Sequence, residues 1–236
     1  MNDKKILVCA PQHISKMYAW SAYSNVLRNL TYENVEFFFS DNSDTEDNSN
    51  FIKSQGFNCE HLKPKKGESL FSKITQSHEA CRAYFLKGDY DYMLHLETDV
   101  IPPIDIIERL LQKELPVVSA MYDIGVGFER YGMIHGLAKH ETLNIKGYKS
   151  VDYLKESEVI EVNGFTTKVL GCGLGCVLIR RDIVSMVKFR NDDKILASAD
   201  TFWSMDLYAN SVPLYLATDI YCKHMNEDWS SKITVA

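Results

Sequence analysis

The stretch Tyr92-Met-Leu-His-Leu-Glu-Thr-Asp-Val-Ile-Pro-Pro103 decides the fold of this chain. Its apolar residues 93–96 predict a short buried strand, and the proline pair predicts a turn soon after it. Glu97 and Asp99 directly follow the strand. Alternate residues of extended backbone point to the same side, so we expect both carboxylates to face one point. Hard oxygen ligands of this kind suit Mg²⁺ or Mn²⁺, although an isolated acidic pair is more often a solvated turn.

Short apolar runs alternate with helical patterns through the first half of the chain. This order predicts an α/β protein with a mostly parallel, doubly wound sheet. In such sheets ligands bind at the carboxyl ends of the strands. Asp41 lies at one predicted strand end and the Glu97–Asp99 pair at another, so a site is expected where they meet. The expected strands cover 6–9, 35–39, 58–62, 93–96 and 117–121, and the expected helices 20–30, 51–55, 70–85 and 104–111.

The second half of the chain has a less regular pattern. Residues 122–168 show no strong period and are expected to form loops with a hairpin. Three alternate glycines then precede the apolar run 176–179. A dinucleotide-binding fingerprint needs a strand before its glycines and a helix after them, and here the order is reversed, which argues against such a site. A helix is expected to begin at Ser198, and two short strands, 214–216 and 220–222, precede His224.

Composition narrows the function further. With 26 basic and 32 acidic residues, the net charge of −6 disfavours a nucleic-acid binder that relies on a broad basic surface. The chain has no apolar run of membrane-spanning length and its amino terminus is too short for a signal peptide, so a cytoplasmic location is expected. Six scattered cysteines, of which only Cys172 and Cys176 lie close together, are expected to be reduced and mostly buried.

Taken in order, these segments resemble the GT-A glycosyltransferases of the family-2-like type over nearly the whole chain. The resemblance implies one GT-A domain, 1–236, with a Rossmann-like doubly wound sheet and a smaller mixed acceptor-side region. Residues 1–121 would bind the nucleotide sugar, and 122–236 would bind the acceptor and complete the catalytic site. The matching segments are Ile6 to Pro11, Asp41-Asn-Ser43, Glu97-Thr-Asp99, Gly171 to Arg181, Ala199-Asp200 and His224.

The resemblance implies which residues bind the nucleotide. Asp41 would accept a hydrogen bond from the base, and the loop at Ala10 and Pro11 would lie along the nucleoside. Lys73 and His78, on the expected long helix, would add positive charge near the diphosphate.

The resemblance also implies a metal site and a base. Asp99 would hold Mn²⁺ or Mg²⁺ against both phosphates, with Glu97 acting directly or through water, Thr98 lying between them, and His224 as a further ligand. Asp200 would be the general base toward the acceptor hydroxyl. Two departures stand out: Glu97 replaces the usual first aspartate, and alanine replaces the glutamate that usually precedes Asp200.

The expected activity is the metal-dependent transfer of a hexosyl or pentosyl unit from a nucleotide sugar, UDP-linked by preference, to a hydroxyl acceptor. The lack of a Gln-x-x-Arg-Trp segment indicates a non-processive enzyme. Asp200 favours inversion, although GT-A enzymes with a late metal-binding histidine can retain configuration. The acceptor stays open between a glycan, a lipid-linked saccharide, a protein and a modified DNA base.

Two alternative functions are also left open. A nucleotidyltransferase would normally carry a glycine-rich basic loop after the first strand, and residues 10–13 lack one. A non-catalytic nucleotide- or sugar-binding module would bind a donor without turning it over.

Overall fold

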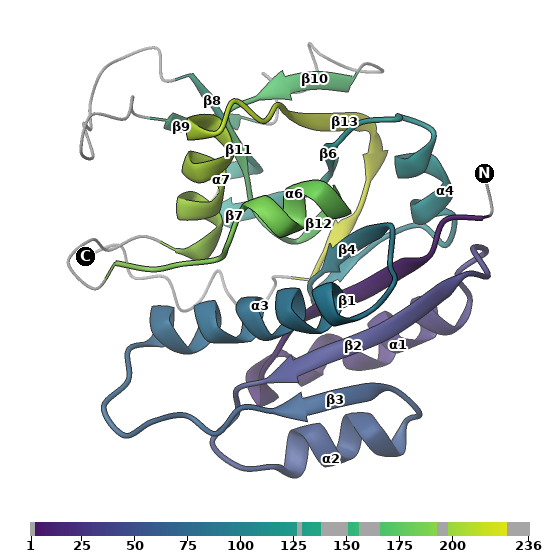
Figure 1. Cartoon of the computed structure of the whole chain (residues 1–236), viewed down its shortest axis with the longest axis vertical. Coiled ribbons are helices and arrows are strands. Elements are labelled where there is room, and N and C mark those ends of the chain that lie inside the picture. The colour runs from purple at the N-terminus through teal and green to yellow at the C-terminus, as the bar shows by residue number, and fades with distance from the viewer. Residues whose placement is uncertain (1–2, 127–128, 138–150, 156–165, 193–197, 226–236) are drawn as a thin grey trace.

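The computed structural model describes residues 3–126, 129–137, 151–155, 166–192 and 198–225. A central eight-stranded sheet forms its middle layer, and helices cover both faces (Figure 1). The strands of this sheet are β1 (Ile6–Gln12), β2 (Val35–Asp41), β3 (Asn58–His61), β4 (Tyr92–Leu96), β6 (Val117–Met121), β10 (Thr166–Val169), β12 (Cys176–Arg180) and β13 (Leu214–Tyr221).

The strand order is β10-β13-β6-β12-β4-β1-β2-β3. The neighbours β4, β1, β2 and β3 are parallel, and so are β6 and β13. β12 runs antiparallel between β4 and β6, and β10 is antiparallel at one edge. The predicted fold class, a mostly parallel and doubly wound α/β sheet, is confirmed. The antiparallel position of β12 was not predicted.

Two apolar cores lie on opposite faces of the sheet. One is formed with α1, α2 and α4, and the other with α3, α6 and α7. Trp20, Tyr23 and Leu27 of α1 are buried in the first core, at the helical spacing seen in the sequence. Cys81 and Phe85 of α3 are buried in the second. The helices are α1 (Trp20–Arg28), α2 (Asp47–Ser54), α3 (Leu70–Lys87), α4 (Ile106–Leu111), α6 (Arg181–Met186) and α7 (Ala199–Ala209), with a short 3-10 helix, η1 (Ile14–Ala19).

Two smaller sheets lie beside the central one. The first has the order β11-β8-β7, with β9 also paired to β8, and its β7–β8 pair is the expected hairpin. The second joins only β5 to β14. Residues 138–150 and 156–165 of the irregular region lie outside the described part. The strands are β5 (Val100–Ile101), β7 (Asp123–Val126), β8 (Glu129–Leu137), β9 (Val151–Lys155), β11 (Gly171–Cys172) and β14 (Lys223–His224).

Some element boundaries differ from the prediction. β13 is one strand with an irregular register between Ala217 and Tyr221, rather than two short strands. The polar Thr218-Asp219 segment that interrupts the hydrophobic pattern lies within β13, in the gap between its paired residues. α2 begins at Asp47 instead of Phe51, so its first turn is formed by polar residues that were expected to precede the helix.

The cysteines agree with the prediction, since all six are free and buried. Among the described residues, every helix is too short or too polar to cross a membrane.

Candidate functional site

Glu97 and Asp99 lie in a tight turn directly after β4. The amide of Val100 donates to the carbonyl of Glu97 at 3.0 Å, and the amide of Glu97 donates to the carbonyl of Gly175 at 2.9 Å. The expectation of extended backbone at this pair is therefore wrong, and the turn brings the two acids together instead. Asp99 is fully buried, whereas the Glu97 side chain is 34% exposed.

β14 places His224 beside Asp99. His224 is the register partner of Val100, and the amide of Met225 donates to the carbonyl of Asp99 at 2.7 Å. As a result, Nε2 of His224 lies 3.5 Å from Oδ2 of Asp99. The ring of Tyr122 packs edge-on against the imidazole, with 5.5 Å between ring centroids. The structure thus brings together two side chains that are far apart in the sequence.

Two side chains from η1 complete this cluster, and sequence reasoning missed both. The Lys16 ammonium donates to Oδ2 of Asp99 and lies 3.9 Å from Oε2 of Glu97. The hydroxyl of Tyr18 donates to the same oxygen of Asp99 at 3.2 Å. A signal was present in the sequence, because Lys16 is the first lysine after β1 and a buried carboxylate such as Asp99 requires a nearby donor or cation.

The two carboxyl groups have opposite shifts in pKa. Burial of Asp99 favours its neutral form, but the hydrogen bond from His224 and the charge of Lys16 outweigh burial and lower its pKa to about 2. Desolvation raises the pKa of Glu97; the charge of Lys16 opposes that rise, and the charges of Asp99 and Asp200 add to it. Asp99 is therefore the carboxyl group of this pair that is ionised at neutral pH.

Asp200 lies in the first turn of α7, close enough for its charge to act on both Glu97 and Tyr122. Its Oδ1 accepts from the amide of Thr201 at 2.8 Å and from the hydroxyl of Ser198. Both hydrogen bonds that the described residues make to this carboxylate go to Oδ1. Oδ2 is therefore the oxygen that can serve another group.

Asp41 ends β2 in a buried polar cluster. Its Oδ1 accepts from the amide and hydroxyl of Ser43, at 3.2 and 2.6 Å, and from the Asn48 amide at 2.8 Å. Its Oδ2 is buried and has no hydrogen-bond partner among the described residues, and the same holds for Nε2 of Gln12. Gln12 is the register partner of Asp41, and Oε1 of Gln12 accepts from the hydroxyl of Thr98 at 2.7 Å. Gln12 was another residue that sequence reasoning missed.

Of the other residues expected to bind a nucleotide, Ala10 and Pro11 differ from the prediction and Lys73 lies on the expected helix. Ala10 and Pro11 belong to β1 rather than to a loop, because β1 pairs with β2 as far as Gln12. Ala10 is fully buried. Lys73 lies on α3, with its ammonium 3.7 Å from Oδ1 of the exposed Asp44.

His78 cannot supply the expected positive charge, because it is buried against His95 of β4, an interior strand of the sheet. Its Nδ1 lies 2.8 Å from Nε2 of His95, whose Nδ1 contacts the carbonyl of Leu174. A carbonyl only accepts, so His95 carries its hydrogen on Nδ1 and its Nε2 accepts from His78. Desolvation, with the charge of His95, lowers the pKa of His78 well below 6.5. Both imidazoles are neutral and hold the glycine-rich loop in place.

That loop approaches the site through Gly175. The amide of Gly175 donates to the hydroxyl oxygen of Tyr122 at 2.7 Å, while its carbonyl holds the amide of Glu97. A Cβ at Gly175 would lie 2.4 Å from Cζ of Tyr122, so no larger residue fits without movement. The glycine thus permits close contact between the loop, Tyr122 and the acidic turn.

The side chains gathered at the acidic turn are of the chemical types that bind a hard divalent cation. Oδ1 of Asp99 is buried without a hydrogen-bond partner among the described residues, and such an oxygen calls for a donor or a cation. Carboxylates from Glu97 and Asp99 with one imidazole from His224 are ligands that Mn²⁺ accepts. In the described part of the chain, however, no three histidine, cysteine or acidic side chains stand in a ready-made cluster. Coordination would require the side chains to move closer together.

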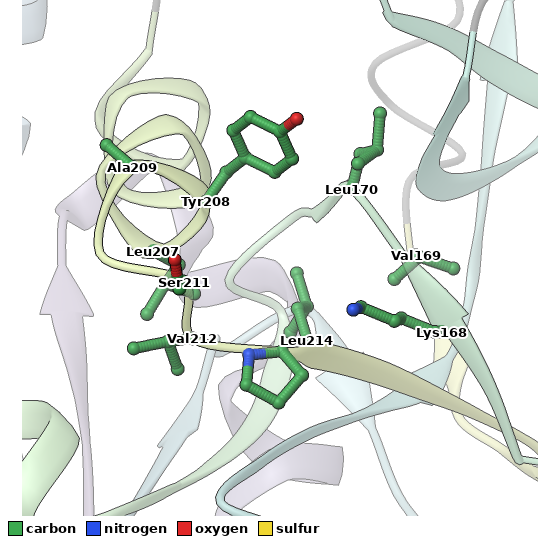
Figure 2. A pocket seen from close by; sticks show the side chains of 10 residues that line it. Lys168, Val169, Leu170, Leu207, Tyr208, Ala209, Ser211, Val212 and Leu214 are labelled. Atoms are coloured by element: carbon green, nitrogen blue, oxygen red, sulfur yellow. The ribbon is translucent and has the colours of Figure 1, made fainter.

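A separate pocket of about 680 Å³ lies where the end of α7, the start of β13 and the end of β10 meet (Figure 2). Tyr208 and Leu170 face it from either side, and Lys168 is its charged lining residue. Because its lining lacks carboxylates and histidines, it does not belong to the acidic site.

Comparisons with known proteins bear on the fold. No protein-family model and no curated protein matches the sequence. The crystal structure of A197 from STIV matches with 16% identity and a TM-score of 0.47, covering 93% of this chain and 85% of that one. The mannosyltransferase PcManGT from Pyrobaculum calidifontis, in complex with GDP-Man and Mn²⁺, matches with 9% identity and a TM-score of 0.58. The fold is glycosyltransferase-like. The match covers 94% of this chain but only 57% of PcManGT.

Proposed function

We propose that this protein is a metal-dependent, non-processive glycosyltransferase that moves a sugar from a nucleotide-sugar donor to a hydroxyl acceptor. The observation that carries the proposal is the meeting of Asp99, Glu97 and His224 at the carboxyl edge of the sheet. Ligands of doubly wound sheets bind at this edge. The likeness in fold to a mannosyltransferase supports the same class of reaction.

Asp99, Glu97 and His224 would hold Mn²⁺ or Mg²⁺. When bound, such a cation would neutralise the negative charge that builds up on the departing nucleoside diphosphate. Asp99 suits the central position, because its low pKa keeps it ionised at any physiological pH. Glu97 is the more exposed carboxylate and can contact the cation directly or through water.

The polar cluster at Asp41 would bind the nucleobase. A buried carboxylate oxygen without a partner is costly, and a donor from a ligand would satisfy it. Only Oδ2 lacks a partner among the described residues, because Oδ1 already accepts from Ser43 and Asn48, and a base would reach this buried oxygen once neighbouring side chains move aside. One open acceptor matches the single imino N–H of uracil better than the adjacent N–H groups of guanine. The donor amide of Gln12 could serve a uracil carbonyl, which supports a UDP-linked donor.

Asp200 would act as general base toward the acceptor hydroxyl. Its Oδ1 is held by Ser198 and Thr201, so the carboxylate is oriented and Oδ2 can take the proton. The acceptor oxygen then bonds to the anomeric carbon as the bond to the diphosphate breaks, with inversion of configuration.

A thermal-shift panel tests the proposal with UDP, GDP, UDP-sugars and GDP-mannose, each with and without Mn²⁺. A ligand at one hundred times its Kd stabilises the fold by about 2.7 kcal/mol, or roughly 5–10 °C in Tm for a chain of this size. We expect a Mn²⁺-dependent rise that is larger for the uridine ligands. If no diphosphate shifts the transition in a Mn²⁺-dependent way, the proposal fails.

Two substitutions test the roles proposed for Asp99 and Asp200. Asp99→Ala should abolish the Mn²⁺-dependent shift, whereas Asp200→Ala should keep it and lose donor turnover. Asp89→Ala is the matched control, since Asp89 is an exposed acid at the opposite end of β4, paired with Lys5. Loss of donor binding in Asp200→Ala would contradict its role as base. Release of pyrophosphate would identify a nucleotidyltransferase instead, and donor binding without any turnover would identify a non-catalytic module.

A further inference from the structure

The pocket at the end of α7 has the size and the lining of a site for a small organic molecule. Its volume of about 680 Å³ falls within the range of roughly 300–1,000 Å³ that ligand pockets show. Val169, Leu207 and Leu214 are buried and form an apolar part of its wall. Tyr208, which is 62% exposed, and Leu170 face the space from either side (Figure 2). A flat apolar body that lies between these two side chains would remove both from water.

Three polar groups border the same space. Lys168 is an exposed residue of β10, and its ammonium points into the pocket (Figure 2). Within the described part of the chain, this ammonium and the hydroxyls of Tyr208 and Ser211 form neither an ion pair nor a hydrogen bond. The lining contains no carboxylate, so Lys168 gives the pocket a net positive charge. An anionic group complements such a lining, because an ammonium and a hydroxyl can both donate to it.

Ser211 holds a backbone conformation that favours glycine. Its φ is 57°, and its amide donates to the carbonyl of Tyr208 at 3.0 Å where α7 ends. Glycine would adopt this conformation at the end of a helix without steric cost. Serine at this position adds a hydrogen-bonding group to the pocket wall at a cost in stability.

We propose that this pocket binds a small organic anion, in which a carboxylate or phosphate is joined to a flat apolar body. The anionic group pairs with Lys168 and accepts from Ser211, and the apolar body lies between Tyr208 and Leu170. An inorganic anion would leave the apolar wall in water, and a neutral molecule would leave the ammonium unpaired. Tyr208 lies eight residues after Asp200 on α7, or about 12 Å along the helix. The site is therefore separate from the acidic one, and its ligand is additional to the substrates of the proposed transfer reaction.

Calorimetric titration of the full chain with three probes tests the proposal. 2-Naphthoate has the apolar body and the charge, 2-naphthamide has the body alone, and acetate has the charge alone. We expect 2-naphthoate to bind and acetate not to bind. 2-Naphthamide should bind about fivefold more weakly than 2-naphthoate, which is what one exposed ion pair contributes at most. Binding should need neither Mn²⁺ nor UDP, and Asp99→Ala should leave it unchanged.

Substitutions in the pocket separate the charge from the apolar contact. Lys168→Met keeps the apolar stem and removes the charge, so it should weaken 2-naphthoate about fivefold and leave 2-naphthamide unchanged. Tyr208→Ala removes the ring and should weaken both about tenfold. Ser211→Gly should raise Tm by about 2 °C and still weaken 2-naphthoate, a combination that a purely structural serine would not give. Lys63→Met, at an exposed lysine after β3, is the control and should bind the probes as the wild type does.

Four results would overturn the proposal. The first is that 2-naphthoate does not bind at millimolar concentration. The second is that Lys168→Met leaves its affinity unchanged, or that 2-naphthamide binds equally well. The third is that binding requires Mn²⁺ and UDP or is lost in Asp99→Ala, which would place the probe at the acidic site. The fourth is a dimer in analytical ultracentrifugation that Tyr208→Ala dissociates, which would make this wall an interface between two copies. Circular dichroism confirms that each variant is folded before titration.

Discussion

Substitution of Gly175 by alanine tests the close contact on which the acidic turn depends. An ideal Cβ at this position lies 2.4 Å from Cζ of Tyr122 and 2.6 Å from its hydroxyl oxygen. Tyr122 is only 4% exposed and also packs against His224, so it has little room to withdraw. The new methyl group must displace the ring or the loop. Either movement breaks the 2.7 Å hydrogen bond from the amide of Gly175.

Two costs add in this variant. Overpacking of a well-filled core costs about 1–3 kcal/mol. A buried amide that loses its acceptor costs about 1–3 kcal/mol more. We expect a loss of about 3 kcal/mol in the free energy of unfolding, which lowers Tm by roughly 6–12 °C for a chain of this length. Because Glu97 donates to the carbonyl of Gly175, Mn²⁺-dependent nucleotide binding should weaken too.

Urea unfolding and calorimetry measure the stability, with two comparison variants. Tyr122→Leu removes the colliding ring, so adding Gly175→Ala in that background should cost under about 0.5 kcal/mol, a clear departure from additivity. Gly67→Ala isolates backbone strain, since Gly67 has φ +80° and nothing within 4 Å of its Cβ position, and should cost about 1 kcal/mol. A single-variant loss below about 0.5 kcal/mol, or an equal loss in both backgrounds, would refute the collision.

Three further predictions concern pH, the nucleobase and a buried arginine. Burial lowers the pKa of His78 well below 6.5, so only the unfolded chain takes up its proton near pH 6.5. This contribution to the free energy of unfolding is therefore fully present above that pH and is lost as the pH falls. Below pH 6, His78→Gln should reduce the dependence of the urea-derived free energy of unfolding on pH by about 1.4 kcal/mol per pH unit. An unchanged dependence would contradict this prediction. Asp41→Asn should weaken UDP binding about tenfold or more in calorimetric titrations and leave the Mn²⁺ affinity unchanged; equal UDP affinity would remove Asp41 from the base site. Arg82 donates to two carbonyls of α6 at 2.7 and 2.9 Å, so Arg82→Met should cost about 2–3 kcal/mol in urea, and a loss under 1 kcal/mol would show that water replaces it.

The local pattern of the sequence predicted most elements because each signal lies within a few residues. An apolar run followed by polar residues located the ends of β2 and β4, and the helical spacing from Trp20 located α1. These signals also explain why Asp41 and Asp99 were found. Asp41 is the last residue of β2, and Asp99 follows the end of β4 by three residues.

What the sequence could not predict depends on contacts between distant segments. The turn at Glu97 is held by Gly175, far along the chain. Lys16, on η1 just after β1, pairs with Asp99, which lies 83 residues further along the chain. His78 was expected to add positive charge near a diphosphate, yet it is buried beside His95 of β4, and burial lowers its pKa well below 6.5. Periodicity describes which face of an element is buried, but not which neighbour covers it.

The position of β12 has a consequence for how the chain folds. β12 fills the gap between β4 and β6, so neither of these strands has its neighbour on that side until residue 180 has been synthesised. A nascent chain that ends near Met121 would leave one edge of β4 and both edges of β6 unpaired, because β12 and β13 are both still missing, and such edges are prone to aggregate. Pairings between segments so far apart in sequence also slow folding. The strands of the first half of the chain therefore keep unpaired edges until the later strands arrive, and we expect fragments cut between β6 and β12 to be insoluble unless the missing half is supplied during refolding.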